Sequence, residues 1–172
     1  MAAEVERFDP LAVIRAFERE RAFYVVIGGL ARVLQGADEL TYGVDVCPSV
    51  RESNLESVQA ALDALEAEAR DRRKTPIAER VARGDEVIPY RTPVGELQIV
   101  PTPAGTQGYD DLRRRAGREY LGDGLRPEVA SINDLSRMLA ARGREQDLER
   151  LLAMRRLHEL ERSIGRGLEL GL

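Results

Sequence analysis

The stretch Val26–Asp45, with the sequence VIGGLARVLQGADELTYGVD, decides how the rest of the chain is interpreted. The aromatic and β-branched residues at 23–27 predict a buried strand, which Gly28 and Gly29 end as the chain enters a short helix. A second strand is predicted around Asp45. Glycines let a backbone approach phosphate closely, and free N–H groups at a helix start attract anions. Asp45 is therefore placed to face an anion held at the two glycines, although a tight turn followed by a surface aspartate fits the residues equally well.

Outward from this stretch, the chain alternates between helical and extended patterns. Cap signals predict a helix from Asp9 to Arg21 and another from Ser49 to Arg70. The other predicted elements are strands at 86–91 and 96–100, a hairpin at 119–129, and helices at 75–83, 109–115, 131–141 and 145–162. This order predicts the α+β (mixed α/β) class. The predicted division is an α/β core at 1–130, C-terminal helices packed on it at 131–162, and a loose tail at 163–172.

The composition is that of a globular protein, with 43% hydrophobic and 33% charged residues. A net charge of −4 and a pI near 5.3 argue against general, non-specific binding of nucleic acid. Cys47 is the single cysteine, so an internal disulfide is impossible and a reduced, cytoplasmic location is expected. The sequence has the pattern of neither a signal peptide nor a membrane span, so no membrane partner is expected.

Six segments, in order along the chain, resemble the minimal nucleotidyltransferase family that includes AbiEii- and MenT-type toxins. VIGGLARVLQG resembles its Gly-Gly opening, TYGVDV its Thr-x-Asp-x-Asp signature, and ESNLESVQAAL the helix that follows. RTPVGELQIV resembles a T-P-x-G-x-L-D segment, GYDDLRRRA a recurrent short helix, and ASINDLSRMLAARGREQDL an A-S-x-x-D-L-x-x-M-K-x-A-x-G-R-x-x-D segment. The resemblance covers residues 23–157 and implies a small nucleotidyltransferase-like mixed sheet flanked by helices, with a C-terminal helical region.

The resemblance also implies an active site, and this chain departs from it. In the family, two or three carboxylates bind Mg²⁺ ions that hold the nucleoside triphosphate and stabilise the leaving pyrophosphate. The first carboxylate position is Gly43 here, the second is Asp45, and the third is Gln98, while the phosphate-contacting lysine matches Leu139. The resemblance therefore implies a degenerate site in which Asp45 remains as catalytic residue and weak metal ligand.

Other positions keep the chemistry that nucleotide binding requires. The resemblance assigns nucleotide binding to Gly28, Gly29, Thr41, Arg137, Arg142, Arg144 and Asp147. Arginine can replace lysine as a phosphate partner, with a different geometry. For each arginine taken singly, a solvated helix face is the alternative interpretation.

Three hypotheses follow. The first is a catalytically impaired nucleotidyltransferase homologue that still binds a nucleotide, RNA or a protein partner, with no cofactor. The second is an active Mg²⁺-dependent enzyme that transfers a nucleotide to tRNA or protein and uses Asp45 with Glu96 or Asp147. The third is an antitoxin-like or scaffold protein that keeps only the fold and binds a cognate toxin or antitoxin.

Four further features have simpler interpretations. His158 has no partner at metal-ligand spacing and is interpreted as a surface or helix-end residue. Cys47 is interpreted as a buried apolar thiol. The basic run at 113–118 could contact RNA phosphates, but the acidic total argues against it. The leucines of the last helix are interpreted as core residues, with dimer formation as the alternative.

Overall fold

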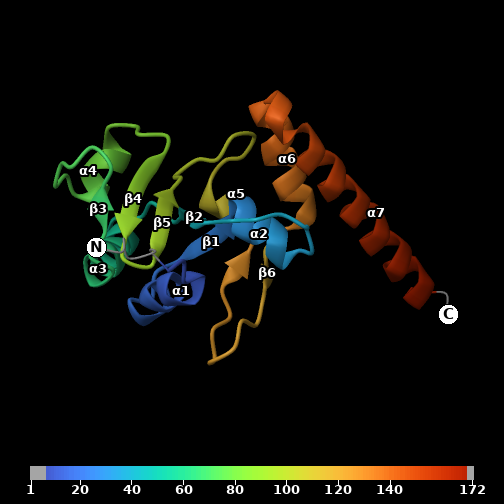
Figure 1. Cartoon of the computed structure of the whole chain (residues 1–172), viewed down its shortest axis with the longest axis horizontal. Helices are drawn as coiled ribbons and strands as arrows, with labels where there is room; N and C mark the ends of the chain where they lie inside the picture. Colours follow the sequence, from blue (N-terminus) through green and yellow to red (C-terminus); the bar gives the residue numbers. More distant parts are fainter. Residues whose placement is uncertain (1–6, 170–172) are drawn as a thin grey trace, which may run out of the picture.

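The structure, a computed structural model, describes residues 7–169, with side chains up to residue 165 (Figure 1). Its centre is a seven-stranded mixed sheet in the order β3-β4-β5-β2-β1-β7-β6. The strands are β1 (Tyr24–Ile27), β2 (Gly43–Pro48), β3 (Glu68–Ala69), β4 (Ile88–Thr92), β5 (Gly95–Ile99), β6 (Gly117–Arg118) and β7 (Glu128–Val129). The helices are α1 (Pro10–Arg19), α2 (Gly28–Leu34), α3 (Glu52–Ala64), α4 (Ile77–Ala82), α5 (Tyr109–Leu112), α6 (Ile132–Arg142), the 3-10 turn η1 (Glu145–Asp147) and α7 (Leu148–Glu169). The predicted class, a mixed sheet flanked by helices, is confirmed.

The centre of the sheet is built from the segment around Gly28 and Asp45. β1 pairs antiparallel with β2 and parallel with β7, and β2 pairs parallel with β5. All four residues of β1 are buried, as the run of aromatic and β-branched side chains predicts. The alternative of a surface aspartate is therefore wrong, because Asp45 lies on a strand with neighbours on both sides.

Local signals explain where several helices begin and end. Asp9 caps α1 through its side chain, and Ser131 caps α6 in the same way, as predicted. Gly143, at a φ of +60°, ends α6 in the left-handed conformation that glycine adopts easily. Ser49, by contrast, is buried and caps nothing, because α3 begins only at Glu52.

Two predicted helices end earlier than expected. The helix predicted to reach Arg70 ends at Ala64, since Glu66 takes a φ of +53° and the chain then adds the edge strand β3 beside β4. The first helix ends at Arg19 because Arg21 also takes a positive φ, +54°. Both turns are made by non-glycine residues, so no glycine marks them in the sequence.

The prediction of a loose tail at 163–172 is wrong for its first seven residues. α7 continues to Glu169, because each added helical residue gains one hydrogen bond from the turn before it. The cost of about 1 kcal/mol for a helical glycine does not end a helix that is already formed. The last three residues of the predicted tail lie outside the described residues.

The C-terminal helices contribute to the same apolar cluster as the sheet. Phe17 of α1, Leu97 of β5, Leu135 of α6 and Met154 of α7 are all buried members of it. α6 contacts α2 and α7, while α4 with β3 and β4 lies at the other end of the molecule (Figure 1). The division into a core at 1–130 and helices at 131–162 stays a prediction. Among the described residues, no helix combines the length and the apolar character needed to cross a bilayer.

Candidate functional site

Asp45 is the centre of the candidate site. In the ladder it is paired with Ile27 of β1 on one side and with Gln98 of β5 on the other. Gly43 is likewise paired with Glu96. Because paired residues point to the same face of a sheet, and alternate residues of a strand do too, these five positions share one face.

Gly28 brings the start of α2 against Asp45. Its φ is +69°, and the Oδ2 atom of Asp45 lies where a Cβ at residue 28 would stand. The second glycine is also close-packed, since a Cβ at Gly29 would lie 3.1 Å from Thr41 Oγ1 and 3.3 Å from Glu39 Oε1. The two glycines therefore allow the backbone approach that the sequence predicts here.

The carboxyl group of Asp45 titrates unusually high for an aspartate. Burial raises its pKa, the Arg32 guanidinium lowers it, and the charge of Glu96 raises it, with a net pKa of about 6. Because desolvation is the largest cause of this shift, the raised pKa does not require further carboxylates beside Asp45. At neutral pH, Asp45 therefore carries a charge that the fold itself solvates poorly.

An ion pair that the sequence analysis missed closes one side of the site. Arg32, only 6% exposed, contacts Glu39 through two hydrogen bonds, Nε to Oε2 and Nη2 to Oε1, each of 2.9 Å. The bidentate geometry fixes the loop after α2 against that helix. An arginine inside the apolar run LARVL was the one available signal, because arginine is rarely buried unless it is paired.

A cleft of about 870 Å³ opens beside Asp45. The sheet contributes Ile27, Asp45 and Gln98, and α2 contributes Gly28 and Arg32. From α6 come Leu135, Met138, Leu139 and Arg142, followed by Arg144. The loop between α4 and β4 and the segment 100–104 line the other walls. Six positions singled out in the sequence thus meet in one cleft: Gly28, Asp45, Gln98, Leu139, Arg142 and Arg144.

Asp147 lies beside this cleft at the centre of a basic cluster. It is 1% exposed, and its Oδ2 lies 2.6 Å from Arg144 Nε and 3.6 Å from Arg142 Nε. Its Oδ1 lies 3.2 Å from Arg150 Nη1. Burial alone would raise the pKa of Asp147, but the hydrogen bonds from Arg144 and Arg150 outweigh it and hold the pKa below its usual range. Asp147 therefore positions the arginines and has no oxygen free of them.

The remaining predicted nucleotide-binding positions lie elsewhere. Thr41 Oγ1 donates to the carbonyl oxygen of Gly43 at 3.1 Å, so it stabilises the loop before β2 and does not line the cleft. Gly29 packs against that loop. Arg137 points to a different face of α6, where its Nη2 lies 3.0 Å from Asp111 Oδ2 and 3.2 Å from Asp134 Oδ1. The helical period puts Arg137 and Arg142 on different sides of α6, but the spacing does not tell which side faces the cleft.

The side chains present do not fit a pair of Mg²⁺ ions. Among the described residues, no group of three or more acidic, histidine or cysteine side chains is placed to hold a metal. A Cβ at Gly43 would lie 3.0 Å from the Glu96 carbonyl oxygen, so a carboxylate there requires β5 to move. Glu96 shares the face of Asp45 but is ion-paired with Arg70. Paired Mg²⁺ ions need several oxygen ligands, and Asp45 is the one carboxylate of the ladder that lines the cleft.

No protein-family model matches the sequence, and no curated protein matches it. Two solved structures are similar in fold. The antibiotic-resistance factor ANT(2'')-Ia, solved in solution, has a TM-score of 0.56 at 11% identity and covers 94% of each chain. The lincosamide antibiotic adenylyltransferase LnuA, solved with lincomycin bound, has a TM-score of 0.58 at 15% identity and covers 90% of this chain and 98% of its own. The chain therefore has a nucleotidyltransferase fold, as its sequence predicts.

Proposed function

We propose that this chain is a diverged relative of the AbiEii- and MenT-type nucleotidyltransferases that binds a nucleotide in the cleft but transfers it poorly or not at all. The observation that carries the proposal is the ladder between β2 and β5. There Asp45 faces Gln98, and Gly43 supplies no ligand atom. An amide offers one neutral oxygen where a carboxylate would offer charge, so this face attracts divalent cations weakly.

The charge beside the cleft supports phosphate binding. Arg32, Arg142, Arg144 and Arg150 form a cluster that ion pairs join to two carboxylates, Glu39 and Asp147. Within this cluster arginines outnumber acids, whereas the rest of the cleft lining holds Asp45, Asp85 and Glu86. The side chains of Arg142 and Arg144 are 38% and 41% exposed, so their guanidinium groups remain accessible to a ligand. Guanidinium groups bind phosphate oxygens through two parallel hydrogen bonds, and here they replace the missing lysine and part of the metal charge.

The wall opposite the sheet is apolar. Leu135, Met138 and Leu139 of α6 are each at most 7% exposed and line the cleft in succession. An apolar wall beside a few placed polar groups is typical of small-molecule sites, and the volume of about 870 Å³ is ample for a nucleoside triphosphate. Leu139 thus extends a surface suited to the flat face of a base or a sugar.

Calorimetric titration with each of the four ribonucleoside triphosphates tests binding, with and without Mg²⁺. We expect one of them to bind, with an affinity that chelation of Mg²⁺ changes by less than about threefold, or ~0.7 kcal/mol. The variant Arg142→Gln should weaken binding, while Arg156→Gln, an exposed arginine of α7 outside the cleft, should not. If none of the four nucleotides binds, the proposal that the cleft binds a nucleotide is wrong.

Transfer is tested separately with labelled nucleotides, Mg²⁺ and two acceptors. Total tRNA represents the acceptor implied by the family resemblance, and lincomycin represents the small molecule bound in the similar structure. We expect no labelled product with either acceptor. Robust labelling that disappears in Asp45→Asn would contradict the proposed impairment and favour the active-enzyme hypothesis.

A second candidate function is that of an interaction protein. Leu148 and Leu152 of α7, and Leu160 and Ile164, are 44–57% exposed, and each pair is spaced by four residues, so each pair forms a small apolar surface on the helix. Contiguous apolar surface of this kind is typical of protein contacts. Co-purification of the native chain with the product of a neighbouring gene, lost in Leu152→Glu, would support this function over nucleotide binding alone.

A further inference from the structure

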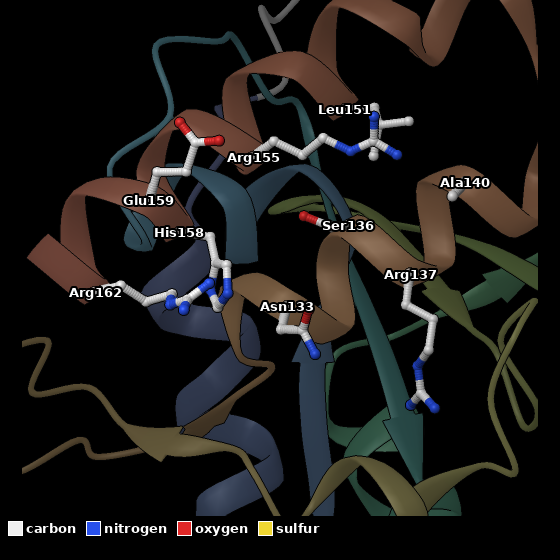
Figure 2. A pocket seen from close by; sticks show the side chains of 9 residues that line it. All are labelled: Asn133, Ser136, Arg137, Ala140, Leu151, Arg155, His158, Glu159 and Arg162. Atoms are coloured by element: carbon white, nitrogen blue, oxygen red, sulfur yellow. The ribbon is translucent and has the colours of Figure 1, made fainter.

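A second hollow lies between α6 and α7, on the side of α6 that faces away from the cleft (Figure 2). Its volume is about 430 Å³. α6 contributes Asn133, Ser136, Arg137 and Ala140 to it, whereas Leu135, Met138, Leu139 and Arg142 line the cleft. The two sets are offset by about half a helical turn, so α6 separates the two spaces.

The wall of this hollow is rich in hydrogen-bond donors that the fold leaves unused. Five buried side-chain atoms of the described residues lack a hydrogen-bond partner, and three of them belong to this wall: Ser136 Oγ, Arg137 Nε and His158 Nδ1. Native folds rarely leave such atoms unpaired, because an unpaired buried polar group destabilises the protein. The Ser136 hydroxyl can donate a hydrogen bond and the Arg137 Nε–H can only donate one, so an acceptor satisfies both, while a histidine Nδ1 pairs with either an acceptor or a donor.

The arginines that line the hollow also favour an anionic ligand. Arg155 and Arg162 of α7 line it, and neither has an ion pair among the side chains that the structure describes. Glu159 is the one acid of the lining, and its carboxylate is turned away from Asn133 and Ser136 (Figure 2). In the same view His158 and Arg162 point toward Asn133. Arg137 also lines the hollow, but its guanidinium is ion-paired with Asp111 and Asp134, so it adds no unpaired charge.

We propose that the hollow between α6 and α7 binds a phosphate dianion, either free or as the monoester of a small molecule. The oxygens of a phosphate dianion accept hydrogen bonds, which is what Ser136 Oγ and Arg137 Nε lack. Arg155 and Arg162 bring two positive charges against the single negative charge of Glu159, and guanidinium groups match the geometry of phosphate. The volume also leaves room for the molecule that carries the phosphate, since small-molecule sites measure about 300–1,000 Å³.

His158 provides the test, because it is the only histidine of the chain and its ring-proton NMR signals are unambiguous. Titration of the full chain with inorganic phosphate at constant pH should move these signals saturably, with a dissociation constant of about 1 mM or tighter. Chloride at matched ionic strength should not move them. A shift that chloride reproduces, or one that never saturates, would overturn the proposal.

Variants locate the site. The double variant R155Q/R162Q should weaken phosphate binding by tenfold or more, whereas R156Q, one residue along the same helix and outside the hollow, should leave it unchanged. The cleft variant R142Q should also leave it unchanged, so this test fails or succeeds independently of nucleotide binding in the cleft. Equal weakening by R156Q would contradict the proposal, and circular dichroism checks that all variants are folded. Adding AMP to the phosphate-bound protein distinguishes a phosphate monoester from the free ion as the ligand. If AMP competes with phosphate, a monoester enters the hollow; if it does not compete, the site is assigned to the free ion.

Discussion

Asp45 and Gln98 are paired across the parallel ladder of β2 and β5, an acid beside an amide in the lining of the cleft. Because Gln98 is an amide and Gly43 has no side chain, Asp45 is the one carboxylate that this ladder brings to the cleft. A second carboxylate at position 98 should therefore raise the affinity for divalent cations.

Gln98→Asp should raise the affinity for Mg²⁺ or Mn²⁺ by tenfold or more, or about 1.4 kcal/mol, because a second carboxylate then faces Asp45. Calorimetric titration of the metal measures the gain. Gln98→Asn, which adds no charge, is the matched control, and adding Asp45→Asn to the aspartate variant should abolish the gain. If the wild-type chain already binds two Mg²⁺ ions at this ladder, the proposed impairment fails.

Asp45 should make the protein less stable at neutral pH than in mild acid. Its folded pKa, about 6, exceeds the ordinary value of 3.8, so the folded state binds the proton more tightly. Stability therefore falls as pH rises from about 4 to about 6, by up to ~3 kcal/mol. Asp147, Asp85 and Asp111 have lowered pKa values, so the changes in stability that accompany their titration occur at lower pH than that of Asp45.

Urea unfolding of wild type and Asp45→Asn at pH values of about 4.5 and about 7.5 measures this effect. The asparagine variant should be the more stable protein at the higher pH and should lose the decline between the two. An equal pH dependence in both proteins would show that Asp45 is not the group responsible.

Gly28→Ala should destabilise the protein by about 2–4 kcal/mol, because a methyl group there meets Asp45 Oδ2 and the φ of +69° disfavours any side chain. Gly84→Ala is the matched control. Gly84 also has a positive φ, +87°, but a Cβ there would have no atom within 4 Å. Its cost should be limited to about 1 kcal/mol. Equal losses of unfolding free energy in the two variants would mean that the contact with Asp45 contributes nothing.

Asp147→Asn should cost about 1–3 kcal/mol and weaken nucleotide binding, because it releases the arginines that the buried carboxylate positions. Since the pKa of Asp147 is lowered in the fold, its stabilising effect is present above the ordinary aspartate pKa and is lost as pH falls below it. Asp110→Asn, which removes an exposed pair with Arg113, is the control and should change stability by less than about 1 kcal/mol. Thermal unfolding and calorimetric titration together measure both effects. A variant that binds nucleotide as well as wild type would remove Asp147 from the site.

The part of the site that lies near the glycines in sequence was predictable. A β-branched run, two glycines and an aspartate on the next strand predict close contact, because consecutive elements usually pack beside each other. The capping residues Asp9 and Ser131 were predictable for the same local reason. Turns made by Arg21 and Glu66 were not, since their positive φ has no residue-type signal.

The mixed fold and the contact of Asp45 with the glycines at the start of α2 could be predicted from the residues alone. Which arginines line the cleft depended on how the elements pack together. Spacing along α6 puts Arg137 and Arg142 in different helical positions, but it does not say which side meets the sheet. That choice depends on how α6 packs against α2 and α7, and hence on contacts between residues far apart in the chain. The same packing buries Asp147 among three arginines and opens the hollow around His158, features that no local pattern encodes.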